Sequence, residues 1–258
     1  MRLMKRILSA AAVLALSASL LVGCSSGTAS SVPVSASSAA ESTVSSVEET
    51  ASSAVDENEA AAAQLLNDLT GSYQELWPVI LADEYKQTWL DDCTALVGED
   101  NAEAAFEKLS SMVTGDVYGE DAVKAYANGG GAYFCGFTNS LAILTFDGET
   151  STISGTDKDG NVLFSHTYHY IGMEPVRGLY EFQSDDADSG EFTYFFLAPD
   201  TSAETYHIEF RYGSDAEALS QYDAGEYAYW VASGISTDCD QTMIDNCIEL
   251  FCNENLAG

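Results

Sequence analysis

The sequence contains few basic residues. Only 9 of its 258 residues are Lys or Arg, whereas 41 are Asp or Glu, and the formal net charge is −32. A chain without a basic patch has nothing to meet the phosphates of a nucleic acid, so we exclude DNA and RNA as partners. A surface this acidic favours solubility and also concentrates cations, metal ions included.

Signatures of thiol chemistry and of catalysis are absent as well. No two of the 6 cysteines have the CxxC spacing of a thiolate zinc site or a redox motif. The cysteines that follow Cys24 are odd in number and irregular in spacing, so we expect no disulfide to be essential to the fold. The sequence has no serine elbow, no HExxH and no phosphate-binding loop. We therefore expect a binding protein rather than an enzyme.

The N-terminus has the pattern of a secretion signal. Arg and Lys in the first six residues form a positive segment, and residues 7–22 are uncharged but too few for a stable membrane span. The segment ends in Leu21-Val22-Gly23-Cys24, which resembles the lipobox of bacterial lipoproteins, whose cysteine sulfur receives a diacylglycerol. We interpret residues 1–23 as a lipoprotein signal peptide. Cys24 then anchors an extracytoplasmic protein to the bacterial membrane.

Beyond the signal the composition changes. Residues 24–56 are rich in Ser, Ala, Val, Thr and Glu and contain no aromatic residue. Such a segment cannot bury enough apolar surface to offset the entropy of ordering, and we interpret it as a disordered tether. Aromatic residues are frequent from Tyr73 onward, and residues 57–258 suffice for one domain with a substantial core.

The hydrophobic pattern of this domain changes from helical to alternating. Apolar residues three and four apart predict helices over 57–67, 73–80, 85–95, 101–112, 215–222 and 238–253. A period of two predicts strands over 132–137, 141–146, 151–156, 162–170, 178–183, 191–197 and 205–212. Short sequential strands favour an antiparallel meander, either a barrel or a sandwich. A lipocalin-like barrel with flanking helices accounts best for the pattern, which makes the fold class mainly β within an α+β arrangement.

Three short blocks, in fixed order within residues 62–250, carry a family resemblance. They are Asp68, Gly71, Tyr73-Gln74 and Trp77-Pro78; then Ala198-Pro199 and Tyr206 to Asp215; then Tyr227-Ala228-Tyr229-Trp230. Together they resemble the ZinT (YodA) family of zinc-recruiting periplasmic or surface domains. The resemblance implies a calycin barrel with flanking helices, zinc binding and a link to zinc import.

The chain departs from the family pattern at the metal site. That pattern has one histidine before the Ala-Pro pair and a His-x-His on the following strand. Phe195 stands at the first position and cannot bind a metal. Aligned without a gap, the His-x-His falls on His207 and Glu209; a shift of two residues places it on Thr205 and His207 instead. We prefer the first alignment because it keeps Arg211-Tyr212-Gly213 in register.

The residues at these positions are competent metal ligands. His207 and Glu209 alternate on one predicted strand, so both face the same side, and imidazole and carboxylate both bind zinc. His166 and His169 are three apart on another strand and therefore face opposite sides, His166 on the apolar face and His169 on the polar one. The predicted site is His207, Glu209 and a third imidazole, His166 ahead of His169, inside the barrel mouth. For each histidine the alternative is a half-buried, hydrogen-bonded side chain without metal.

These features predict a lipid-anchored surface protein that binds zinc, or another divalent metal, and supplies a zinc ABC importer. The alternative is the same barrel with a decayed metal site, which binds a small apolar or sugar-like ligand or a protein partner. Phe195, in the place of a histidine, motivates this alternative.

Lipidation of Cys24 is directly testable. Labelled fatty acid should enter the protein in a bacterial host that modifies lipoproteins. Replacement Cys24→Ser should abolish both the labelling and the association with membranes, because the thioether forms on that sulfur. Labelling that persists in the Cys24→Ser variant would contradict the interpretation.

Overall fold

A computed structural model describes residues 57–127, 131–198 and 207–257. The predicted signal peptide, Cys24 and the predicted tether lie outside the described residues. Within those residues, no helix has the length and apolar character that crossing a membrane requires.

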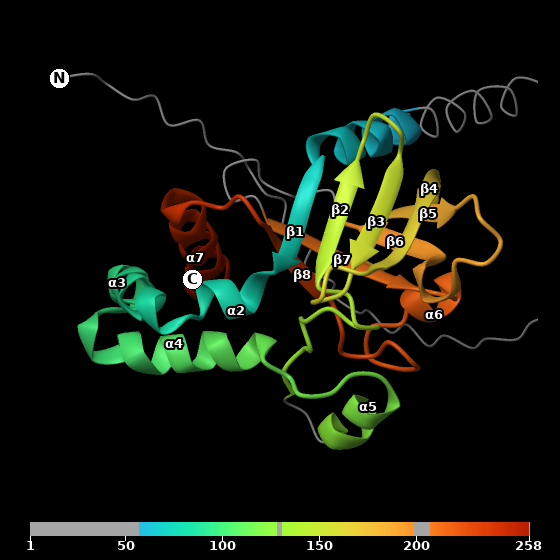
Figure 1. Ribbon diagram of the computed structural model, residues 1–258. Helices are drawn as coiled ribbons and strands as arrows, with labels where there is room; N and C mark the ends of the chain where they lie inside the picture. The colour runs from blue at the N-terminus through green and yellow to red at the C-terminus, as the bar shows by residue number, and fades with distance from the viewer. Residues whose placement is uncertain (1–56, 128–130, 199–206, 258) are drawn as a thin grey trace, which may run out of the picture. The chain divides into compact units, whose positions relative to one another are not determined.

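Eight antiparallel strands form a closed barrel in the order of the sequence (Figure 1). They are β1 Gly71–Glu75, β2 Ile143–Asp147, β3 Thr152–Thr156, β4 Val162–Met173, β5 Tyr180–Ser184, β6 Tyr194–Leu197, β7 His207–Gly213 and β8 Ala232–Ser236. The barrel closes where β8 pairs with β1, with Ser236 opposite Tyr73. The predicted fold class, an antiparallel lipocalin-like barrel with flanking helices, is confirmed, and the structure is a barrel rather than a sandwich.

The two strands that close the barrel are not among the predicted ones. Tyr73, Leu76 and Ile80 have helical spacing, yet they belong to two elements: Tyr73 lies on β1, and the other two lie on α2 (Leu76–Ile80). β8 gives no alternating signal because four of its five residues are buried, on both faces of the strand. The predicted strand 132–137 is wrong: within it only Phe134 makes isolated bridges, to Thr114 and Trp230.

Helices cover one end and one side of the barrel. Residues 57–68 are helical, and Ala62, Leu65 and Leu66 pack into the barrel core, so this helix covers the barrel end beside β1–β3 (Figure 1). The other helices are α3 Lys86–Val97, α4 Glu99–Val113, α5 Glu120–Tyr126, α6 Ala216–Leu219 and α7 Gln241–Leu256, with 3-10 turns at Asp83–Tyr85 and Gly190–Phe192. The pattern does not predict α5.

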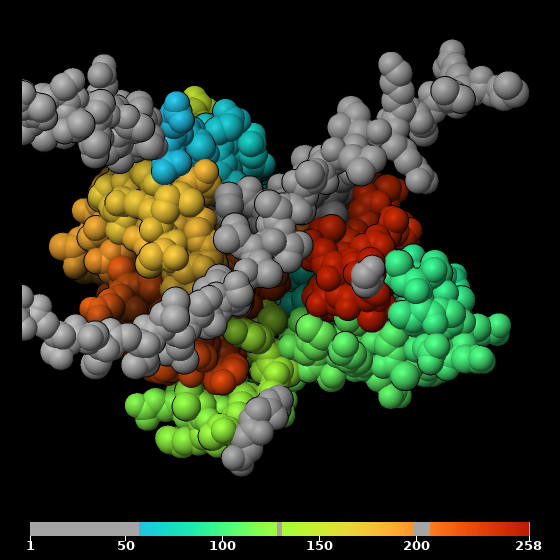
Figure 2. All heavy atoms as spheres, turned by 180° about the vertical axis from the view of Figure 1, so that it is seen from behind, coloured from blue at the N-terminus to red at the C-terminus, as the bar shows by residue number. Residues whose placement is uncertain are grey.

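Buried side chains form two cores. The barrel interior is filled by aromatic rings, among them Phe146, Phe164, Phe182, Phe195, Phe210 and Tyr212. The second core lies between the outer surface of the barrel and a helical layer made by α2, α3, α4 and α7. It contains Trp77, Trp89, Cys93 and Ile248, together with Ile235 of β8. Both views show α3 and α4 beside α7, on the side of the barrel away from β4 and β5 (Figures 1 and 2).

Phe195 tests the packing of the barrel interior. Its ring is fully buried and lies 5.3 Å from the Tyr212 ring and 5.4 Å from the Tyr168 ring, measured between centroids. Phe195→Ala should lower the free energy of unfolding by about 3–5 kcal/mol, because it removes buried apolar surface and leaves a cavity. Val162→Ala on β4 is the matched control; that side chain is 70% exposed, and its loss should cost about 0.5 kcal/mol or less. Denaturant unfolding measures both. Equal effects would contradict this account of the core.

Candidate functional site

Strand β7 sends alternate side chains to opposite sides of the barrel wall. Ile208, Phe210 and Tyr212 are buried in the interior core, whereas His207 and Glu209 lie on the outer face. On β8, Ile235 lies opposite His207, and Ile235 packs into the helical layer. The predicted same-face arrangement of His207 and Glu209 is therefore confirmed. Their predicted position inside the barrel mouth is corrected: they face the helical layer, because the interior positions of β7 carry apolar side chains.

His207 and Glu209 line a pocket of about 60 Å³ between β7 and α7. The apolar walls come from α2 and α7, and Glu254 of α7 adds a second carboxylate. A space of this size accommodates an ion with one or two waters but not an organic ligand. One imidazole and two carboxylates, from two elements far apart in the sequence, therefore line the pocket.

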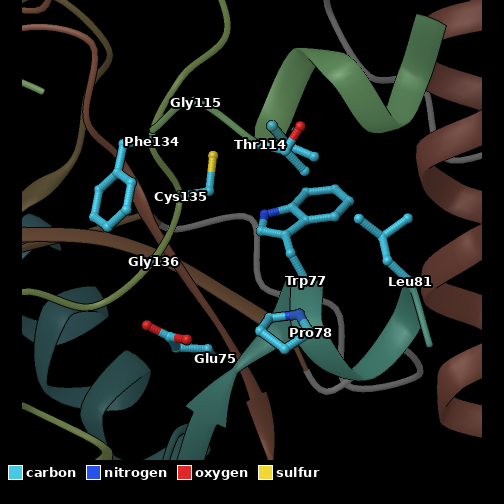
Figure 3. Close-up of a pocket in the computed structure, with 10 residues that line it drawn as sticks. Glu75, Trp77, Pro78, Leu81, Thr114, Gly115, Phe134, Cys135 and Gly136 are labelled. Atoms are coloured by element: carbon cyan, nitrogen blue, oxygen red, sulfur yellow. The ribbon is translucent and has the colours of Figure 1, made fainter. Parts of the chain in front are cut away.

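A larger pocket of about 320 Å³ adjoins the first, since Trp77, Glu209, Phe251 and Glu254 line both. Its lining also includes Arg177, Tyr133, Ser233 and Asn255. A third pocket, of about 340 Å³, shares Trp77, Val113 and Cys135 with the second (Figure 3). We call this run of three adjoining pockets, between the outer face of the barrel and the helical layer, the seam.

Trp77 is common to all three pockets of the seam. Its indole is nearly buried, at 7% exposed, and among the described residues its Nε1 makes no hydrogen bond of normal geometry. The nitrogen edge of the ring faces the wall that carries Cys135 (Figure 3). Contact with the Trp77 side chain lowers the pKa of the Cys135 thiol, against the larger effect of burial.

Cys135 contributes a thiol rather than a thiolate to the seam. Burial, with a smaller contribution from the nearby Glu209 carboxylate, raises the pKa of Cys135 to about 12. Thiolate is the form that attacks electrophiles and binds metals, so at neutral pH this sulfur does neither readily.

His166 and His169 lie on opposite faces of β4, as predicted. His166 stacks on Phe164 at 6.0 Å between ring centroids, and its Nδ1 lies 2.7 Å from an Asp186 carboxylate oxygen. The His169 side chain is 53% exposed, and its Nδ1 lies 2.6 Å from an Asp185 carboxylate oxygen. Each therefore has a hydrogen-bonded carboxylate partner on the loop after β5.

Neither of these histidines joins the pocket of His207. Strands β5 and β6 separate β4 from β7 in the barrel, and the pocket lining includes neither residue. Within residues 57–127, 131–198 and 207–257, no group of three or more His, Cys, Asp or Glu side chains is arranged to hold a metal ion. The four predicted ligands thus occupy three separate places, of which only the one on β7 combines two of them.

Comparisons with known proteins found structural matches of low sequence identity. No protein-family model matches the chain, and no curated protein matches its sequence. The Zn(II)-bound ZinT-like domain of AdcA from Streptococcus pneumoniae is similar in structure, with a TM-score of 0.45 and 15% identity over 71% of this chain and 89% of that one. The structure of Zn(II)-bound AdcA from the same organism gives a TM-score of 0.43 and 14% identity over 72% of this chain and 35% of that one, so this chain spans about a third of AdcA. The fold assignment itself rests on the strand pairing described above.

Sequence reasoning missed Glu254 and Trp77 as members of the site. Glu254 is one of 41 acidic residues, and nothing in its local sequence marks it. Its apolar neighbours on α7, at helical spacing, place that helix against the barrel, and only this docking brings the carboxylate beside β7.

The state of Cys135 can be measured by alkylation. At about pH 8, a pKa of about 12 leaves roughly one sulfur in ten thousand as thiolate, against about one in ten at the ordinary value of 9.0. Iodoacetamide should therefore modify Cys135 in the folded protein about a thousandfold more slowly than in denaturant. Peptide mapping after timed quenching gives both rates. Similar rates in the two states would show that the seam holds a reactive thiolate.

Proposed function

We propose that this protein is a membrane-anchored extracytoplasmic protein that binds a divalent transition metal, zinc foremost, and supplies it to a metal importer. One observation carries the proposal: His207 and Glu209 project together from β7 into an ion-sized pocket that Glu254 of α7 also lines.

The donor set suits this cargo. Imidazole nitrogen and carboxylate oxygen are both ordinary zinc ligands, and a site with three protein ligands or fewer keeps positions for water. Open positions let a metal be exchanged, which a carrier requires and a structural zinc site avoids. The net charge of −32 adds a field that draws cations toward the surface.

The proposed anchor fits the same task. A lipid on Cys24 would keep the protein at the membrane, and a flexible segment between anchor and barrel would allow the domain to reach an importer in that membrane. Linking of this kind raises the effective concentration of one partner around the other without any new contact.

A second candidate function rests on the larger pocket of the seam. Its 320 Å³ suit a small organic ligand, with Trp77 and Phe251 as aromatic walls and Arg177, Glu209 and Ser233 as polar groups. This candidate corresponds to the alternative of a barrel with a decayed metal site. Its ligand would bind on the outer face of the barrel, because aromatic rings fill the interior. Loss of His207 should not affect such a ligand, because His207 does not line that pocket.

Zinc should stabilise the protein in a pH-dependent manner. A metal that binds only the folded protein stabilises it by about 2.7 kcal/mol at one hundred times the dissociation constant. Histidine binds metal only when neutral, so the effect should be present at about pH 7.5 and fade as the pH falls through about 6.5. His207→Ala should lose most of the rise in melting temperature and Glu209→Ala part of it. The measurement is a thermal melt with and without zinc.

Two controls separate a site from general attraction. His169→Ala should respond to zinc like the wild type, because His169 lies on β4 with Asp185 as its partner. Calcium or magnesium should not replace zinc, whereas attraction to the acidic surface alone would be mimicked by both and weakened by salt. If the wild type and His207→Ala respond to zinc alike, the metal-site proposal is wrong and the second candidate function is preferred.

A further inference from the structure

Two buried cysteines meet between α3 and α7. Cys93 and Cys252 are both 0% exposed, and their sulfur atoms lie 4.0 Å apart although 159 positions separate them in the sequence. We propose that Cys93 and Cys252 form a disulfide bond in the exported protein, which ties the helix after α2 to the last helix of the chain. This proposal does not depend on metal binding. It replaces the expectation drawn from cysteine spacing, which carries no information on a pair so far apart.

The packing around the pair holds the two sulfurs in place. Trp89 lies one helical turn before Cys93 on α3 and contacts Phe251, the neighbour of Cys252, at 6.0 Å between ring centroids. Phe251 also packs on Trp77 of α2, at 4.8 Å. Forming the bond requires the sulfurs to approach by about 2 Å, to the usual S–S length. An approach of this size is within the range that rotation about the two Cα–Cβ bonds can produce.

The chemistry is a thiol–disulfide exchange. A small-molecule disulfide, or the disulfide of an extracytoplasmic oxidase, accepts two electrons and two protons and leaves as two thiols. Cys93 and Cys252 lose the same two protons and two electrons as the new S–S bond forms. The thiolate of one cysteine first attacks the incoming disulfide and releases one thiol, which leaves a mixed disulfide. The other cysteine then attacks the mixed disulfide, forms the Cys93–Cys252 bond and releases the second thiol.

Burial determines when this exchange takes place. Burial raises the pKa of both thiols, and the contact between them raises that of Cys252 further. In the folded protein both are therefore protonated and out of reach of an oxidant. The bond has to form while the chain folds, after α3 and α7 have met and before the helical layer has closed over the sulfurs.

The cross-link bears on the candidate site through α7. Leu250, Phe251 and Glu254 line the His207 pocket, and Cys252 lies among them on the same helix. The bond would also close a loop containing most of the domain, including every strand from β2 to β8. A bond that closes so long a loop strongly lowers the conformational entropy of the unfolded chain. Reduction of the bond should therefore lower the melting temperature by roughly 10 °C.

Peptide mapping of the full chain tests the proposal directly. Protein exported by a bacterial host, and separately protein refolded with oxidised and reduced glutathione, is trapped with N-ethylmaleimide in denaturant. Cleavage after Glu then releases residues 85–99, which contain Cys93, and residues 250–254, which contain Cys252; each peptide has no other cysteine. The expected result is a single species of the two peptides joined, which separates on reduction.

Matched variants decide between this pair and any other. Cys93→Ala and Cys252→Ala should each abolish the joined species and the effect of reductant on the melting temperature. Cys135→Ala, a buried cysteine in the seam, should change neither. Recovery of both peptides with maleimide on each sulfur, or of either one joined to a different cysteine, overturns the proposal. Because the refolded sample does not require export, failure there is independent of the lipoprotein and metal proposals.

Discussion

The pairing of β8 with β1 is the constraint on which the rest of the structure depends. It joins a strand at the start of the domain to one near its end, removes both open edges of the sheet and encloses the aromatic core. It also fixes the elements that follow the two strands. α2 begins directly after β1, and α7 begins a few residues after β8, so both helices leave from neighbouring strands and pack on the same side of the barrel. The seam is the space between that helical layer and the barrel wall.

The location of the candidate site outside the barrel follows from how the barrel is filled. In a barrel of about eight strands the interior has room for side chains or for one small ligand. Here Phe195, Phe210 and Tyr212 are fully buried, and together with other aromatic rings they fill that volume. The outer faces of β7 and β8, by contrast, carry His207, Glu209 and Ser233. The helical layer covers these groups unequally: Ser233 is buried, His207 is half-buried and Glu209 is exposed, and all three lie next to cavities.

The fold class could be predicted from the sequence because it depends on local signals. Alternating apolar residues and turn residues mark β2 to β7, and no long-range knowledge is needed to detect them. β1 and β8 escape detection for a physical reason. β1 has only five residues before a helix starts, and β8 is buried on both faces, so neither shows a half-buried alternation.

The site residues could be predicted in part. Successive side chains of a strand point to opposite faces, so the sequence alone gives the correct relative orientations of His166 and His169 on β4 and of His207 and Glu209 on β7. Which face of β7 points inward depends on the neighbouring strands, and Glu254 reaches the site only through the docking of α7.

α7 links the two proposals, although neither requires the other. Its last two turns carry Phe251, which packs on α2 and α3, Cys252, which meets α3, and Glu254, which lines the pocket of His207. A metal held by groups from both β7 and α7 would require a fixed separation between barrel and helix, and holding that separation has an entropic cost. A bond from Cys252 to α3 would reduce this cost before any metal arrives, because a site whose supports are already fixed loses less freedom on binding. The helix that sequence analysis identifies only by its apolar face thus determines how well ordered the candidate site is.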